Sequence, residues 1–159
     1  MKNIRYAALV LALLCLGVSC KKEKNDGDTP QATACNGMNL CFKLNGTSES
    51  HNATWKVLNN RYRVLWEEGS GNNYKNIELD MYGTTTGSYA VNANPSAGQA
   101  GFQYYINDNG TVKNIQGQSG TVEITAIDGT KITGKFTVTA TDGGTNYEIT
   151  EGNFVAVPQ

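Results

Sequence analysis

The sequence predicts an all-β domain, an antiparallel meander that forms a β-sandwich, with a closed up-and-down β-barrel as the alternative. Three observations favour this class. Apolar residues recur with a period of two from Asn39 onward, turn residues punctuate these stretches at short intervals, and no stretch of the mature chain has helical periodicity. Short strands between turns occur in both architectures, and of the two we favour the sandwich.

The most specific strand pairing is predicted for residues 55–67. If Asn59-Asn60 is a two-residue turn, Val57 lies opposite Tyr62 and Trp55 lies opposite Val64. This register places the apolar side chains on one face, and on the other face it places the basic ones, Lys56, Arg61 and Arg63. Two apolar residues do not fit it, Leu58 and Leu65. The segment is therefore expected to be a half-buried hairpin.

Alternating apolar residues predict the other strands, at residues 40–44, 77–81, 89–91, 102–106 and 147–149. Two further segments, 120–129 and 134–143, echo each other, because each carries an apolar trio on one face and ends in an Asp-Gly turn. The core is predicted to contain Trp55, Val57, Tyr62, Val64, Ile77, Leu79, Val122, Ile124, Phe136 and Val138.

Residues 1–19 have the pattern of a lipoprotein signal peptide. Lys2 and Arg5 precede an uncharged stretch that is shorter than the about 20 residues needed to span a bilayer. The run Leu-Gly-Val-Ser-Cys that ends at Cys20 resembles the bacterial lipobox, although the leucine lies one place further from the cysteine than usual. We expect lipid on Cys20 to anchor the mature protein in the cell envelope, at the outer membrane, on its periplasmic or surface face. A plain secretory signal is the alternative.

Residues 20–38 are predicted to be the lipidated cysteine and a disordered tether, and residues 39–159 a single domain. Residues 21–34 contain no large apolar side chain, so they cannot offset the entropy of ordering. Removal of residues 1–19 reduces the 13 basic residues to 11, against 14 acidic ones, a net charge of −3. This mildly acidic composition lacks the clustered basic residues of nucleic-acid-binding proteins, so we expect no nucleic-acid partner.

The C-terminal half resembles a family of small Bacteroidota lipoproteins of unknown function. The shared series begins with Gly-Thr-Val-Glu-Ile-Thr at residues 120–125, continues through residues 132–140 and ends with Ile-Thr-Glu-Gly-Asn-Phe at residues 149–154. Upstream, residues 44–46 and Trp55 are similar to the opening of the family, with a longer insert between them. The resemblance implies a lipoprotein with an all-β domain. It implies no activity and no catalytic residues.

Cysteine and histidine are the first candidates for chemistry. Cys35 and Cys41 are the only thiols besides Cys20 in the mature chain, and outside the cytoplasm such a pair favours a disulfide. A two-residue turn at Asn36-Gly37 would instead place Cys35 opposite Met38. His51, the only histidine, lies in a polar stretch that reads as a loop, and no nucleophile motif accompanies it. We expect no catalytic role for it and no metal site.

Carboxylates and exposed aromatic residues are the remaining candidates. Glu78 and Asp80 share one face of a strand about 7 Å apart, a spacing compatible with glycoside hydrolysis, although a solvated face is the simpler interpretation. Residues 107–110 lack the flanking ligands of a calcium loop and read as a turn. Tyr82 and Tyr105 fall opposite the apolar stripes of their strands, so they are the candidate ligand contacts.

These features favour a membrane-anchored, non-catalytic binding or accessory module that needs no cofactor. Its expected partner is a glycan or a protein of the cell envelope. A lipid-anchored inhibitor of a secreted protease or lysozyme is the alternative, and a glycan hydrolase that uses Glu78 and Asp80 ranks behind both.

Overall fold

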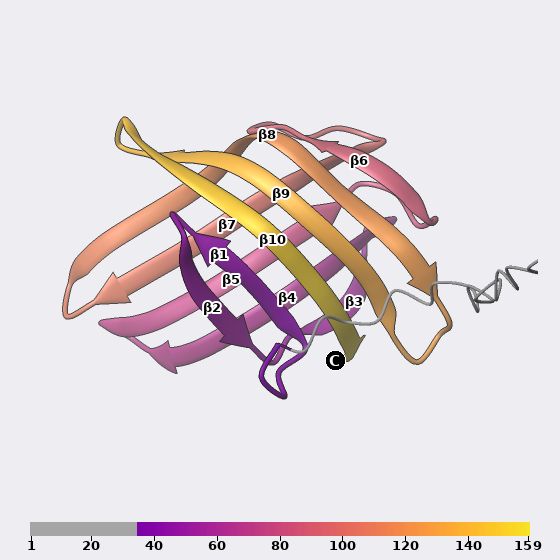
Figure 1. Ribbon diagram of the computed structural model, residues 1–159, viewed down its shortest axis with the longest axis horizontal. Helices are drawn as coiled ribbons and strands as arrows, with labels where there is room; N and C mark the ends of the chain where they lie inside the picture. Colours follow the sequence, from indigo (N-terminus) through magenta and orange to yellow (C-terminus); the bar gives the residue numbers. More distant parts are fainter. Residues whose placement is uncertain (1–34) are drawn as a thin grey trace, which may run out of the picture.

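The computed structural model describes residues 35–159, and every regular element in this part of the chain is a β-strand. The strands are β1 (Leu40–Leu44), β2 (Thr47–His51), β3 (Thr54–Leu58), β4 (Arg61–Ser70), β5 (Asn73–Met81), β6 (Gly87–Val91), β7 (Gln99–Asp108), β8 (Thr111–Ile127), β9 (Ile132–Asp142) and β10 (Thr145–Pro158). They form one sheet in the order β2-β1-β10-β3-β4-β5-β7-β6-β8-β9, which closes into a ring because β9 also pairs with β10 and β7 with β8 (Figure 1). The predicted all-β class is confirmed, and the ring fits a sandwich as well as a barrel.

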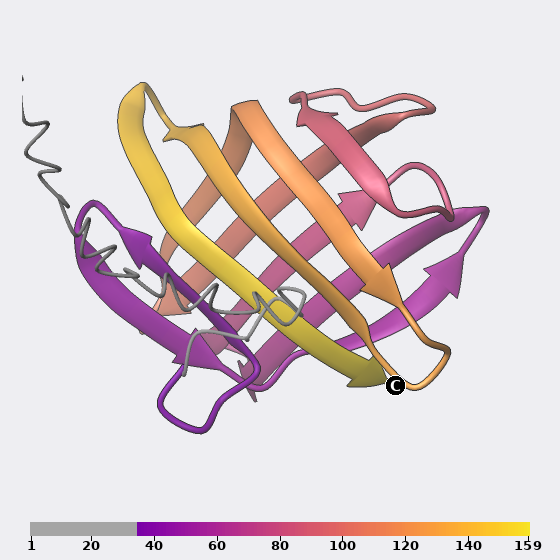
Figure 2. The ribbon, with the colours of Figure 1, turned by 45° about the vertical axis from the view of Figure 1, so that its right-hand side comes forward.

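The ring is flattened into two layers whose strands cross steeply (Figure 2). We call β1, β2, β9, β10 and the second half of β8 the front layer, and β3, β4, β5 and β7 the back layer. Strand β8 belongs to both, because residues 111–116 pair with β7 of the back layer and residues 116–127 pair with β9 of the front layer. Its register shifts between Gly117 and Ser119, and such bulges bend a strand from one layer into the next. Gly117 suits the bend, since a Cβ there would lie 2.8 Å from Val91 Cγ1.

Two short parallel pairings complete an otherwise antiparallel arrangement. Val157 and Pro158 of β10 pair with Thr54 and Trp55 of β3, and the end of β6 pairs with the start of β7. The first of these joins the layers on the side away from β8. Strand β10 therefore contacts β9 along one edge, and β1 and β3 along the other.

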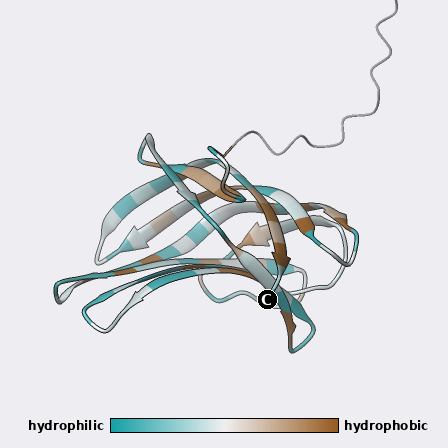
Figure 3. Cartoon of the chain, turned by 90° about the horizontal axis from the view of Figure 1, so that it is seen from below, coloured by the Kyte–Doolittle hydropathy of each residue, from teal (hydrophilic) through white to brown (hydrophobic). Residues whose placement is uncertain are grey.

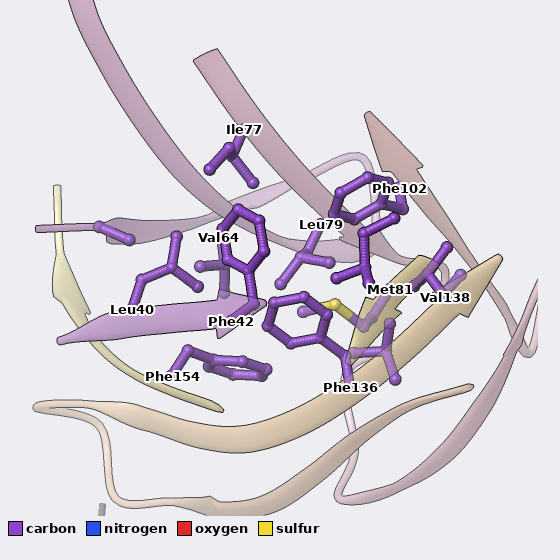
Figure 4. Packing of buried hydrophobic residues seen from close by; sticks show 14 of the residues in the cluster. Leu40, Phe42, Val64, Ile77, Leu79, Met81, Phe102, Phe136, Val138 and Phe154 are labelled. Carbon is purple, nitrogen blue, oxygen red and sulfur yellow. The ribbon is translucent and has the colours of Figure 1, made fainter. Parts of the chain in front are cut away.

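The core lies between the two layers and draws side chains from both (Figure 4). The ring centroid of Phe136 is 5.9 Å from that of Phe42, 6.2 Å from that of Phe102 and 6.4 Å from that of Phe154. Hydrophobic stretches are interspersed along the strands, whereas most turns are hydrophilic (Figure 3). All the predicted core residues are buried except Trp55 and Val57.

The hairpin of β3 and β4 has the predicted register, with Val57 opposite Tyr62 and Trp55 opposite Val64. The prediction that Val57 is a core residue is wrong, because its side chain is 57% exposed. Strand β10 pairs with β3 only at Thr54 and Trp55, so within residues 35–159 the edge of β3 that faces away from β4 has no paired strand at Val57. Trp55 is partly buried and packs edge-on against Tyr62.

Candidate functional site

A cluster of ion pairs occupies the outer face of the back layer. The cross-strand register places Arg63 of β4 beside Asp80 of β5. Arg63 Nε and Nη2 each donate to one carboxylate oxygen of Asp80 at 2.8 Å, and Nη1 lies 3.1 Å from Glu78 Oε2. These side chains are only 14–21% exposed, and the hydrogen bonds to Asp80 are the main reason why the pKa of Arg63 is raised. The arrangement is therefore a partly buried salt bridge with fork-to-fork geometry, the stronger kind of ion pair.

Arg61 extends this cluster to Tyr82, which directly follows β5. Arg61 Nη1 donates to the Tyr82 hydroxyl at 2.6 Å, and the guanidinium carbon lies 4.9 Å from the centroid of the ring. Arg61 Nε is buried and makes no hydrogen bond within residues 35–159, although Asp80 Oδ1 is 3.6 Å away. Tyr82 is thus held in place by a cation, and an unused donor lies close behind it.

A groove opens beside Tyr82, with a volume of about 160 Å³. We call it the Tyr82 groove, and its polar lining residues are Glu78, Asp80, Tyr82, Asn92, Gln103 and Gln116. Pro95 closes one side, and Gly101 leaves space on its floor because a side chain there would approach Pro95. The loop after β6 and the strands β5, β7 and β8 together form the groove. It offers carboxylates, which accept hydrogen bonds, and amide and phenol groups, which both donate and accept them.

The structure does not bring the two candidate tyrosines together. Tyr105 of β7 lies opposite Asn76 of β5, on the same outer face as Tyr82 but about 20 Å from it along the strand. Its ring centroid is 6.1 Å from that of Tyr74, whose hydroxyl donates to Glu67 Oε1 at 2.7 Å. Desolvation and this hydrogen bond raise the pKa of Tyr74 to about 12. Tyr82 lines a groove, whereas Tyr105 belongs to a flat aromatic pair.

His51 occupies a different environment from the one predicted. It is the last residue of β2 rather than part of a loop, and its ring stacks on Trp66 with 3.8 Å between centroids. The loop prediction was wrong because β2 is an edge strand that pairs with β1 alone, and its residues lack the alternating apolar pattern by which strands are predicted. Burial lowers the pKa of His51. Ser48 and Ser50 line the outer surface of the front layer instead, so strand alternation separates them from His51.

Cys35 and Cys41 form a disulfide, with 5.4 Å between their Cα atoms. Cys35 also forms an isolated bridge with Met38, and Asn36 and Gly37 adopt positive φ angles between them. The two-residue turn and the disulfide, which were alternatives in the interpretation of the sequence, therefore occur together. The bond fastens the start of the described chain to β1.

Other sequence predictions concern the residues before Cys35. The signal peptide, Cys20 and the greater part of the proposed tether lie outside the described residues. Within residues 35–159, no helix is long and apolar enough to cross a membrane. The same residues contain no group of three or more His, Cys, Asp or Glu side chains arranged to hold a metal ion.

Sequence reasoning missed several residues of the Tyr82 groove. Asn92, Pro95, Gln103 and Gln116 come from segments that only the fold brings beside β5. The ion pairs of Arg61 and Arg63 could have been predicted. The two arginines alternate on one strand, and carboxylates alternate in the same way on the strand that follows it. Opposite charges on the same face of neighbouring strands are expected to pair.

The comparisons with known proteins give a family but no activity. Comparison with curated proteins and with solved structures finds no significant match. Residues 46–158 match the family described as "Domain of unknown function (DUF6252)". The match begins at the turn between β1 and β2 and ends with β10, so it includes the Tyr82 groove and the ion-pair cluster. Because it covers most of the sequence, the chain belongs to the DUF6252 family.

Proposed function

We propose that this protein is a lipid-anchored, non-catalytic module that binds a glycan of the cell envelope in the Tyr82 groove. The observation that carries the proposal is the groove itself, because three of its polar side chains, Glu78, Asp80 and Tyr82, are held in place by neighbouring arginines. Arg63 holds Asp80 and Glu78, and Arg61 holds Tyr82. A ligand that binds such a preorganised site loses less free energy to the ordering of side chains.

The size and chemistry of the groove suit one sugar ring. Its volume of about 160 Å³ equals that of about five water molecules, at roughly 30 Å³ each. Sugar hydroxyls both donate and accept hydrogen bonds, as the amides of Gln103 and Gln116 and the hydroxyl of Tyr82 do.

The state of the two carboxylates supports a binding role over hydrolysis. A glycosidase places a proton-donating carboxyl group and a second carboxylate on either side of the scissile bond. Here Glu78 and Asp80 come from one strand, and the same guanidinium group of Arg63 contacts both. One guanidinium group thus engages both carboxylates on one strand, rather than leaving them on opposite sides of a bond to be cleaved.

The proposal can be tested with the full chain, purified from membranes in detergent, on an array of neutral and acidic envelope glycans. We expect Tyr82→Ala to weaken binding at least tenfold, because it removes the wall of the groove. Tyr105→Ala is the matched control, a tyrosine on the same face outside the groove, and it should bind like the wild type. Loss of binding in Tyr105→Ala alone would move the site to the Tyr74–Tyr105 pair.

Two other outcomes would contradict the proposal. Turnover of a polysaccharide that is abolished in Glu78→Gln would make the protein a hydrolase. Co-purification of one secreted protease or lysozyme, with no glycan bound, would favour the inhibitor.

The lipid anchor is tested separately. Cys20→Ala should release the protein from the membrane fraction, and a variant that stays in the pellet would rule out lipidation at this residue.

A further inference from the structure

Strand β10 contains an unusual backbone conformation at Glu151. Its φ angle is 53°, and the register with β9 shifts between Ile149 and Gly152. Every other non-glycine residue with positive φ in residues 35–159 is an asparagine, the residue type that best tolerates this region: Asn36, Asn45, Asn59, Asn60 and Asn109. A glutamate gains no such advantage, so a glycine at this position would be less strained. Strain that persists in the middle of a strand often marks a functional position.

The bulge places Glu151 and Asn153 between two hollows on the outer face of the front layer. The first, of about 390 Å³, extends over β1 and β2, where Lys43, Ser48 and Ser50 line it. The second, of about 380 Å³, extends over β9 and β8, where Thr121 and Thr137 line it. Glu151 and Asn153 line both hollows. Because the two hollows share Glu151 and Asn153, we treat them as one groove, which crosses five neighbouring strands over a distance of about 19 Å. We call it the Glu151 groove.

The two lysines of the Glu151 groove are both paired with carboxylates. Lys43 Nζ donates to Glu151 Oε1 at 2.7 Å, and Lys135 Nζ lies 3.1 Å from Glu123 Oε2. The remaining polar side chains are the carboxylate of Glu49 and several hydroxyls and amides, including those of Ser48, Thr137 and Asn153. Both cations of the groove already have carboxylate partners, so the groove holds no surplus positive charge for an anionic polymer.

The direction of the groove indicates the class of ligand. Because it runs across the strands, the backbone groups along it are mostly used in the sheet, and the ligand meets side chains instead. An extended peptide is usually bound beside an edge strand, through main-chain hydrogen bonds. A neutral polysaccharide has hydroxyl groups along its whole length, which match the hydroxyl, amide and carboxylate groups of this surface.

We infer that the Glu151 groove is a second binding site, which takes an extended neutral oligosaccharide of about four sugar residues. Its ligand class is that of the proposed function, but its site lies on the other layer and shares no residue with the Tyr82 groove. Glu151 accepts hydrogen bonds from the ligand at the centre of the groove. The strained backbone keeps its carboxylate between the two hollows at the expense of stability.

The test combines binding with thermal stability in the full chain. The probes are tetrasaccharides of glucose, mannose and xylose, with tetragalacturonic acid as the acidic comparison. At least one neutral probe should slow hydrogen exchange in residues 41–50, 135–137 and 151–153. Glu151→Gly should weaken that binding at least tenfold and raise the thermal midpoint by a few degrees, because glycine relieves the strain. Glu148→Gln, on the same strand outside both hollows, should change neither quantity.

The possible failures are distinguishable. Protection confined to residues 78–82 and 101–103, and lost in Tyr82→Ala, would overturn this inference and leave the proposed function intact. Protection of the Glu151 groove by tetragalacturonic acid alone would overturn the ligand class. A lower thermal midpoint in Glu151→Gly would show that the glutamate serves the fold, and would overturn the argument from strain. If no probe protects either groove, both proposals fail.

Discussion

The outer faces of the two layers are both polar, but they hold their charges differently. In the back layer, the four side chains of the ion-pair cluster are between 14% and 21% exposed. In the front layer, the side chains of the Lys43–Glu151 and Lys135–Glu123 pairs are between 38% and 66% exposed. Partial burial strengthens an ion pair and fixes its geometry, whereas exposed pairs are screened by solvent and exchange partners easily. The back face is therefore rigid, and the front face can rearrange around a ligand.

The front and back layers share one core, and the largest expected effect comes from Phe136→Ala, which removes a ring from its centre. Phe136 is buried and packs near three other phenylalanines from both layers. We expect a loss of about 3–5 kcal/mol in the free energy of unfolding, measured by urea denaturation. A loss below about 1 kcal/mol would show that this ring does not join the layers.

The second prediction compares glycines of the two layers. A Cβ on Gly134 of β9 would lie 2.2 Å from Phe154 Cζ and 2.3 Å from the carbonyl oxygen of Glu123, whereas one on Gly101 of β7 would meet nothing closer than Pro95 Cγ at 3.2 Å. Gly134→Ala should therefore destabilise the domain by about 3 kcal/mol through overpacking. Gly101→Ala should lie within about 0.5 kcal/mol of the wild type. Equal losses would mean that β9 has room that the structure does not show.

The third prediction addresses the ion pairs directly. Arg63→Met leaves Glu78 without a cationic partner and Asp80 with only the longer contact to Arg61 Nε at 3.6 Å, and should cost about 2 kcal/mol in urea denaturation. Lys135→Met breaks an exposed pair, and should cost less than about 1 kcal/mol. High salt should reduce the loss of stability in Lys135→Met more than the loss in Arg63→Met. If the two substitutions cost the same, the distinction between a rigid and an adaptable face would be lost.

The smallest expected effect concerns the contact between the layers at His51. Burial lowers the pKa of His51 below 6.5, so the unfolded chain binds a proton more readily than the folded protein does. Stability should be constant above the unfolded pKa and should fall as the pH decreases toward the folded pKa. Glu49 and Glu68 lie nearby, and so does Lys75, which also lowers the pKa. Urea midpoints measured between about pH 7.5 and 5.5 would reveal the slope.

His51→Phe is the control for this prediction, because it keeps a ring against Trp66 and removes the titrating group. Its urea midpoint should change less with pH than that of the wild type. An identical slope in both proteins would assign the effect to the surrounding carboxylates.

The sequence predicted the fold best where a strand has one apolar face and a tight turn. The register around Asn59 and Asn60 was correct because alternation and turn geometry agree, and both asparagines adopt positive φ. Strand β2 escaped notice because an edge strand with Glu49 and His51 on its inner side carries no apolar pattern. The prediction that Val57 is a core residue failed because the alternation of apolar residues predicts which face of a strand a residue occupies, but does not predict where the neighbouring strand ends.

The candidate site was predictable only in part. Tyr82, Glu78 and Asp80 could be placed on one outer face from alternation alone. The rest of the Tyr82 groove depends on the loop after β6 and on β8, which come from distant parts of the chain. The conformation of Glu151 leaves no trace in the sequence, because a glycine follows it and would be the expected residue at a bulge. The alternation of residues along a strand therefore predicts which face of the sheet a side chain occupies, whereas the residues that line a groove are known only from the tertiary fold.

The position of β10 has a consequence for how the chain folds. This strand joins β9 to β1 and β3, and it pairs Phe154 with Leu40, near the other end of the domain. During synthesis, β1 to β9 emerge before the strand that completes their core, so Leu40 and Phe42 have no permanent cover until β10 arrives. Contacts between residues so distant in sequence make folding slow, on the millisecond-to-second scale of all-β domains. A chain truncated before β10 should expose apolar surface and aggregate rather than fold in part.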